Sequence, residues 1–255
     1  MVEIKSDASL DAMRIAGRVV GDALAAVRRA ADVRVSLKEL DEVARGVLRE
    51  AGADSPFLNY RPSFADTPFP AVICASVNDA IVHGIPTDYR LRDGDLVSID
   101  CGALLGGWAG DAATSFIVGT PRPADLALIE TTERALAAGI AAAVVGARIG
   151  DISHAIGSVG RAAGYGIPAD FGGHGIGRSM HEDPHLPNDG RPGRGMRLRH
   201  GMVLAIEPMF LAGGHGDYDT APDGWTLVTA DGTRAAHAEH TVAITDDGPR
   251  ILTLP

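Results

Sequence analysis

The stretch "SIDCGALLGGWAGDAATSF" (Ser98–Phe116) places two acids, Asp100 and Asp111, among apolar and small residues. Strand-forming residues lead into and out of a central pair of glycines, a pattern that predicts a β-hairpin. If the turn centres on Leu105-Gly106, the two acids face each other with Cβ atoms about 4.5–5.5 Å apart. Carboxylates placed in this way repel each other unless a cation lies between them. The stretch therefore indicates a divalent metal site, or a register shifted by one residue with one acid in solvent.

The second half of the chain repeats this pattern. "RDGDLVSID" (Arg92–Asp100) matches "RHGMVLAIE" (Arg199–Glu207) at Arg, Gly, Ile and the final acid. A second acid-bearing strand follows in each half, with Asp111 in the first and Glu239 in the second. The echo predicts a pseudo-symmetric fold that brings four carboxylates to one centre. Two divalent cations would balance that charge, and His174, held between glycines, is the candidate nitrogen ligand.

Composition limits the classes of protein to which the chain can belong. Its 255 residues are 45% hydrophobic and 22% charged, which is ordinary for a soluble globular protein. The net charge of −10 argues against nucleic acid as a partner. Two cysteines, no signal-peptide pattern and no apolar run long enough to span a bilayer predict a cytoplasmic protein that binds no membrane. Apolar periodicity and capping signals predict helices over about residues 8–30, 36–51, 123–145 and 151–163.

Several motifs of the chain resemble those of the methionine aminopeptidases, and specifically their short bacterial form. They include "SVNDAIVHGIP" (Ser76–Pro86), "WAGDAATSFIVG" (Trp108–Gly119), "GGHGIGRSMHEDP" (Gly172–Pro184), "GMVLAIEPM" (Gly201–Met209) and "AEHTVAIT" (Ala238–Thr245). The likeness covers nearly all of the chain. It implies an α/β (α+β) pita-bread fold, in which a pseudo-two-fold symmetric antiparallel sheet carries helices on its outer face. It also implies one catalytic metallopeptidase domain over residues 1–255.

The resemblance implies roles for particular residues. The metal ligands would be Asp100, Asp111, His174, Glu207 and Glu239, which would hold two divalent ions. In this family, water activated by the two ions attacks the first peptide bond and releases the initiator methionine, preferably when the second residue is small. Glu207 would shuttle a proton, and His83 and His181 would contact the substrate near the scissile nitrogen and the carbonyl oxygen. One histidine and four carboxylates favour Mn²⁺ or Fe²⁺, while Co²⁺ commonly supports activity in the family.

A pocket for the methionine side chain is implied less firmly by the same resemblance. Its walls would be Tyr60, Phe69, Cys74, Met180 and Trp225, which could equally be ordinary core residues. The chain departs from the family at residues 61–67, where the loop looks longer, and at Met180, which replaces an aromatic residue. His237 stands where the family commonly has glutamine, two residues before the last ligand, where it could alter the hydrogen bonding around the metal site without removing a ligand. It and the histidines at 154, 185, 200, 215 and 240 are expected to be structural or exposed, with His240 pointing away from Glu239.

The expected partners are the N-termini of nascent polypeptides. The resemblance also implies contact with the ribosome, and a monomer is the expected state. One alternative is a proline-specific aminopeptidase or dipeptidase of the same fold, although those proteins usually carry an additional N-terminal domain. Another is a catalytically inactive binding module, although such proteins have typically lost metal ligands.

Overall fold

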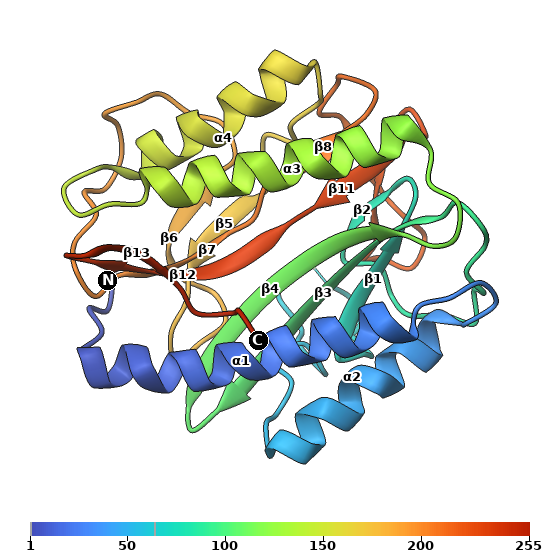
Figure 1. Cartoon of the computed structure of the whole chain (residues 1–255), viewed down its shortest axis with the longest axis horizontal. Coiled ribbons are helices and arrows are strands. Elements are labelled where there is room, and N and C mark those ends of the chain that lie inside the picture. Colours follow the sequence, from blue (N-terminus) through green and yellow to red (C-terminus); the bar gives the residue numbers. More distant parts are fainter. Residues whose placement is uncertain (1, 64) are drawn as a thin grey trace.

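The structure is a computed structural model that describes residues 2–63 and 65–255 (Figure 1). Its helices are α1 (Asp7–Ala30), α2 (Leu37–Ala51), α3 (Pro123–Ala142) and α4 (Ile149–Ala163). Its strands are β1 (Ile73–Val77), β2 (Ala80–Val82), β3 (Leu96–Leu105), β4 (Trp108–Ile117), β5 (Gly172–Gly175), β6 (Glu182–Pro187), β7 (Val203–Ile206), β8 (Met209–Leu211), β9 (Tyr218–Thr220), β10 (Leu227–Thr229), β11 (Ala235–His237), β12 (Glu239–Thr245) and β13 (Gly248–Ile251).

Local capping chemistry explains where the helices begin and end. Ser36 and Glu39 form the predicted capping box at the start of α2, and Gly52 ends that helix in the left-handed conformation. Helix α4 begins two residues earlier than predicted because the carboxylate of Asp151 accepts a 2.7 Å hydrogen bond from the backbone N–H of Arg148. That bond makes Asp151 the third residue of the helix rather than the first.

The main sheet is built from two matching halves. Its strand order is β1-β3-β4-β12-β7-β5-β6, with β13 added beside β12, and every pairing is antiparallel. The pair β3–β4 from the first half and the pair β7–β12 from the second meet where β4 lies beside β12. The repeat seen in the sequence is therefore a repeat of strand pairs about the centre of the sheet.

Helices cover each half of this sheet in turn. Helices α1 and α2 pack on β1, β3 and β4, whereas α3 and α4 pack on the second half, against β6, β7 and β12 (Figure 1). Two apolar clusters fill these contacts, one for each helix pair. Among the described helices, none is both long enough and apolar enough to cross a membrane.

The β3–β4 hairpin differs from its predicted register by two residues. Leu105 pairs with Trp108, so the turn is Gly106-Gly107, with φ values of 59° and 78°. A tight turn with positive φ at both central residues favours glycine at both, and a turn centred on Leu105 would strain that residue. Asp111 consequently faces Gly102 rather than Asp100. The prediction of direct pairing was wrong, but a shift of two residues leaves both acids on the same face of the sheet.

Candidate metal centre and substrate pocket

A cavity of about 390 Å³ opens at the middle of the sheet. It brings together every residue that the sequence analysis selected as a ligand, a substrate contact or a pocket wall. They are Tyr60, Phe69, Cys74, His83, Asp100, Asp111, His174, Met180, His181, Glu207, Trp225 and Glu239. These residues come from both halves of the fold and from the loops between them. Their segments are far apart in the sequence and come together only in the folded chain.

Four acids converge at one side of the cavity. Asp100 lies on β3, Asp111 on β4, Glu207 directly after β7 and Glu239 at the start of β12. Burial raises the pKa of Asp100 to about 7; His237 opposes this shift and the charge of Glu207 adds to it. Burial, followed by the charges of neighbouring acids, also raises the pKa values of Asp111 and Glu239 well above their usual range, and burial does the same for Glu207. The cluster cannot carry four negative charges at neutral pH unless a cation balances them.

The hydrogen bonding of this cluster fits a metal ion. Among the described residues, Asp100 Oδ1, Asp111 Oδ1 and Glu239 Oε1 are buried and have no hydrogen-bond partner. Buried carboxylate oxygens are normally hydrogen-bonded or bound to a metal, because burial strips them of water. A divalent cation would satisfy all three oxygens and would also lower the pKa values of the acids that bind it.

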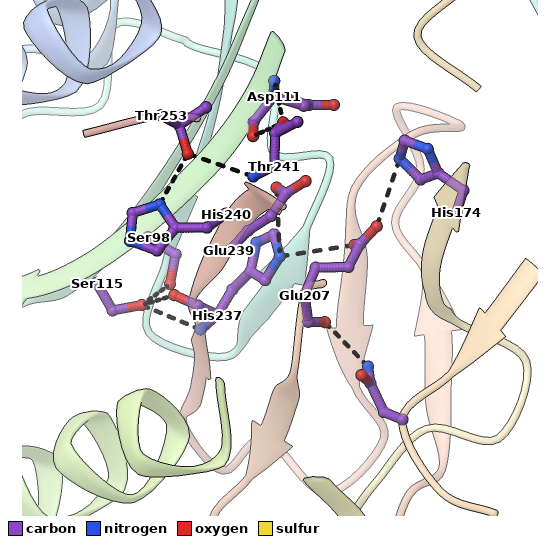
Figure 2. Close-up of polar contacts among 11 residues, drawn as sticks. Ser98, Asp111, Ser115, His174, Glu207, His237, Glu239, His240, Thr241 and Thr253 are labelled. Atoms are coloured by element: carbon purple, nitrogen blue, oxygen red, sulfur yellow. Dashed lines mark hydrogen bonds and ion pairs between the residues drawn. The ribbon is translucent and has the colours of Figure 1, made fainter. Parts of the chain in front are cut away.

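The imidazole of His174 is oriented to act as a ligand. Its Nδ1 lies 2.8 Å from the carbonyl oxygen of Gly175, and because a carbonyl only accepts, Nδ1 carries the proton. The Nε2 lone pair therefore points toward Glu207, whose Oε1 lies 3.6 Å away (Figure 2). Burial lowers the pKa of His174 to about 3, which keeps the ring neutral and able to bind a metal.

Glycine next to His174 allows this placement. A Cβ atom on Gly173 would lie 2.0 Å from the carbonyl oxygen of Ala205 on β7. Strand β5 can therefore approach β7 closely only because residue 173 has no side chain. The close approach of β5 to β7 places His174 beside the carboxylates.

Donor atoms gather in two groups that share one residue. Atoms of Asp111, His174 and Glu239 lie within 4.8 Å of one another, and so do atoms of Glu207, His237 and Glu239. Both groups have the mixed oxygen and nitrogen donors that suit transition metals. Glu239 therefore lies within reach of both groups of donor atoms.

Two further histidines face the cavity. His83 has a positive φ of 60°, and its ring contacts Trp225 edge-on with ring centroids 6.5 Å apart. His181 lies against His174, at 4.4 Å between ring centroids, and against Tyr60 at 5.5 Å. Burial lowers the pKa of His83 to about 4 and also lowers that of His181, so both rings are neutral at pH 7.

Aromatic and apolar side chains form the other side of the cavity. Phe69 and Trp225 pack edge to face at 5.2 Å, and the indole N–H of Trp225 donates a 3.0 Å hydrogen bond to the carbonyl oxygen of Thr67. Cys74 pairs with Asp100 across β1 and β3, which places the pocket directly beside the acids. Loop 61–67 therefore supports the pocket through Thr67, while residue 64 of this loop lies outside the described residues.

The sequence analysis missed several residues of the site. Phe57, Asp170, Phe171, His185 and Met209 also line the cavity. Met209 could have been predicted from the sequence, because it ends the motif that contains Glu207. The others lie in loops or short strands with no spacing signal. His237 was expected to be structural, and it proves to be 2% exposed with Nε2 only 3.6 Å from Glu207.

The remaining histidines agree better with expectation. His240 lies next to Glu239, and its Nδ1 is 2.8 Å from the hydroxyl of Thr253, away from the acids. His154 and His215 are exposed, and the ring of His200 lies between surface carboxylates.

The fold and the acid cluster together define a metal-dependent hydrolase, and comparison with known proteins supports this class. The sequence model of metallopeptidase family M24 matches residues 11–246. The chain therefore belongs to family M24 and binds divalent metal.

Close relatives narrow the assignment within that family. The chain is 55% identical to methionine aminopeptidase 1 of Mycobacterium tuberculosis (strain CDC 1551 / Oshkosh), and the match covers 100% of this chain and 96% of the relative. The crystal structure of methionine aminopeptidase from Thermotoga maritima superposes with a TM-score of 0.95 at 37% identity, covering 100% of both chains. Within M24, the chain falls among the methionine aminopeptidases.

A more distant structure shows the shared fold. The prolidase from Pyrococcus horikoshii OT3 superposes with a TM-score of 0.76 at 22% identity, and the match covers 98% of this chain but 63% of the prolidase. At this level of identity the superposition shows that the two proteins share the pita-bread architecture.

Proposed function

We propose that the protein removes the N-terminal methionine from nascent polypeptides, preferably when the second residue is small. The observation that carries this proposal is a cluster of buried, unpartnered carboxylates at one side of a cavity whose other side is apolar and aromatic. The acids supply a place for metal ions, and the apolar side supplies a place for one side chain. The full-length likeness to methionine aminopeptidases supports methionine as that side chain.

Two divalent ions would be held by Asp100, Asp111, His174, Glu207 and Glu239. When bound, they supply Lewis-acid chemistry at the peptide carbonyl and lower the pKa of water. The donor set of mainly oxygen with one nitrogen suits Mn²⁺, Fe²⁺ or Co²⁺.

The side chains around the acids have separate tasks. The substrate's free α-amine would be held at the metal centre, which would restrict cleavage to the first residue. The neutral rings of His83 and His181 can donate hydrogen bonds to the scissile nitrogen and to the carbonyl oxygen as charge develops there. We propose that Glu207, which lines the cavity beside the other acids, takes a proton from the attacking water and passes it to the leaving nitrogen.

The pocket accounts for the choice of methionine. A thioether side chain is flexible and polarisable, and it makes favourable contacts with aromatic rings such as those of Phe69 and Trp225. Met180 adds a second flexible side chain to the wall, where it lies 9% exposed. We propose that a pocket wall with Met180 adapts to the substrate side chain more readily than a wall with an aromatic residue at that position.

The setting of the reaction follows from the substrate. We propose that the enzyme acts as a monomeric single domain in the cytoplasm, where free N-termini emerge from the ribosome.

The decisive experiment is peptide cleavage by metal-stripped protein after Mn²⁺, Fe²⁺ or Co²⁺ is added back. We expect metal-dependent release of methionine from Met-Ala-Ser, little cleavage of Leu-Ala-Ser and none of an X-Pro peptide. Asp100→Asn removes one ligand at almost constant shape and should lower the rate by about 100-fold or more.

Two results would contradict the proposal. Faster cleavage of the X-Pro peptide than of Met-Ala-Ser would show that the metal centre is active but that the protein is a proline-specific peptidase. Binding of metal and peptide without turnover would assign a binding module.

A further inference from the structure

We propose that His237 is an additional metal ligand of this centre, on the opposite side of Glu207 from His174. The inference rests on the metal centre proposed above and adds a second nitrogen donor to it. Figure 2 shows Glu207 between the two imidazoles. Each of its oxygens faces one ring, with Oε1 at 3.6 Å from His174 Nε2 and Oε2 at 3.6 Å from His237 Nε2.

The environment of His237 leaves Nε2 without any other partner. The residue is 2% exposed, and Nε2 is among the buried polar atoms that have no hydrogen-bond partner in the described part of the chain. A buried ring nitrogen without a partner is costly, as is a buried carboxylate oxygen without one. Donor atoms of His237, Glu207 and Glu239 all lie within 4.8 Å of one another.

The distances suit a shared ion better than a direct hydrogen bond. His237 Nε2 lies 3.6 Å from Glu207 Oε2 and 4.0 Å from Glu239 Oε2. An N–H···O hydrogen bond spans about 2.7–3.2 Å, so neither contact qualifies. Two donor atoms that bind one ion at about 2.0–2.2 Å each can lie up to about 4.3 Å apart, and both contacts fall within that limit.

The backbone holds His237 firmly in this position. Its N–H donates a 3.0 Å hydrogen bond to the hydroxyl oxygen of Ser115, and that hydroxyl donates a 2.7 Å hydrogen bond to its carbonyl oxygen. His237 also pairs with Met209 across β11 and β8. Because side chains two residues apart on an extended chain share a face, His237 points the same way as Glu239. Contacts with β4 and β8 thus fix the backbone from which the ring projects.

A second imidazole would change which ions the centre prefers. Nitrogen donors favour the later ions of the Mn²⁺ to Cu²⁺ series more than oxygen donors do. We therefore expect loss of His237 to weaken Co²⁺ binding by about tenfold or more, and Mn²⁺ binding by less.

The test is proton NMR of the cobalt-loaded protein together with cobalt titration calorimetry. A histidine bound to Co²⁺ through one ring nitrogen shows its other N–H as a strongly shifted resonance that exchanges with solvent. We expect two such resonances in the wild type, from His174 and His237. His237→Gln should show one, with one class of Co²⁺ site weakened by about tenfold. His240→Gln is the matched control, because it removes the neighbouring ring that bonds to Thr253, and it should keep both resonances.

The outcomes separate this inference from the proposed function. One shifted resonance in the wild type, with Met-Ala-Ser still cleaved, would overturn the role of His237 alone. Two resonances that both persist in His237→Gln would overturn it as well. Wild-type protein that binds no Co²⁺ would overturn the role of His237, and the proposed function would also be overturned if Met-Ala-Ser is not cleaved with Mn²⁺ or Fe²⁺. The wild-type spectrum gives an answer even if His237→Gln fails to fold.

Discussion

Asp111 pairs with Gly102 across the β3–β4 hairpin, so its carboxylate lies diagonally from that of Asp100 on one face of the sheet. Diagonal positions are about 7–8 Å apart, farther than directly opposed ones. The two side chains nevertheless reach toward each other, and after burial the charge of Asp100 helps to raise the pKa of Asp111. The position opposite Asp111 must be glycine, because Pro56 and Phe57 occupy the space that a side chain there would need; a Cβ atom on Gly102 would lie 2.7 Å from Pro56 and 2.9 Å from the ring of Phe57.

The first prediction concerns the stability of metal-free protein. The pKa of Asp100 is raised to about 7 in the folded state from its ordinary value of 3.8, so this carboxyl destabilises the fold increasingly as pH rises between those values. We expect Asp100→Asn to raise the free energy of unfolding at pH 8 by about 2 kcal/mol and to have a smaller effect at pH 5. Urea unfolding measures both. Asp88→Asn, at an exposed carboxylate, should change neither, and saturating Mn²⁺ should reverse the order of wild type and Asp100→Asn.

The second prediction concerns the close approach of β5 to β7. Gly173→Ala would place a methyl group 2.0 Å from the Ala205 carbonyl oxygen, and we expect it to lower the free energy of unfolding by about 3 kcal/mol. The same substitution at Gly46, in helix α2 with nothing within 4 Å, should raise it by about 0.5–1 kcal/mol. Thermal unfolding of the two variants distinguishes them. Equal effects at both sites would show that the approach of the strands is not tight.

The third prediction concerns acid sensitivity. Burial lowers the pKa of His83 to about 4 from 6.5, so the unfolded chain binds more protons between these values and stability falls as pH decreases from 6.5 toward 4. This group should account for about 2 kcal/mol of the stability lost by metal-free protein between pH 7 and pH 5. His83→Gln should lose correspondingly less over that interval. Parallel losses in the two proteins would mean that the ring is not buried in neutral form.

The fourth prediction concerns the support of strand β1. Buried Asp41 accepts hydrogen bonds from the backbone N–H groups of Val72 and Ile73, at 2.8 and 3.1 Å, and from the side chain of Arg45. Asp41→Ala would leave two buried N–H groups unpaired and should cost about 2–4 kcal/mol in urea unfolding. Asp41→Asn keeps an acceptor oxygen for them and should cost about half as much. Because Cys74 follows Ile73 on the same strand and lines the pocket, Asp41→Ala should also raise KM for Met-Ala-Ser. An unchanged KM would show that the hydrogen bonds of Asp41 do not affect the shape of the pocket.

The features predicted correctly from sequence depend either on nearby residues or on the repeat between the two halves of the chain. The capping box of Ser36 and Glu39 places the start of α2, and the repeat of acid-bearing strands predicts that the four carboxylates meet. The hairpin register was wrong by two residues because it depends on the φ angles that Gly106 and Gly107 adopt, and several turns fit the same letters. The spacing of two residues between His237 and Glu239 predicts an effect on the surroundings of the metal site. The distance of its ring from Glu207 could not be predicted, since it depends on contacts with Ser115 and Met209, which lie far from His237 in sequence.

The division of the site between the two halves of the sheet also sets the order of its assembly. Asp100 and Asp111 come from the first half, whereas His174, Glu207 and Glu239 come from the second. While the chain is being synthesised, the aspartate pair emerges long before any residue that could share a cation with it. The centre stays incomplete until translation has passed Glu239. An enzyme of this kind therefore has no complete centre until both halves of its sheet have been synthesised.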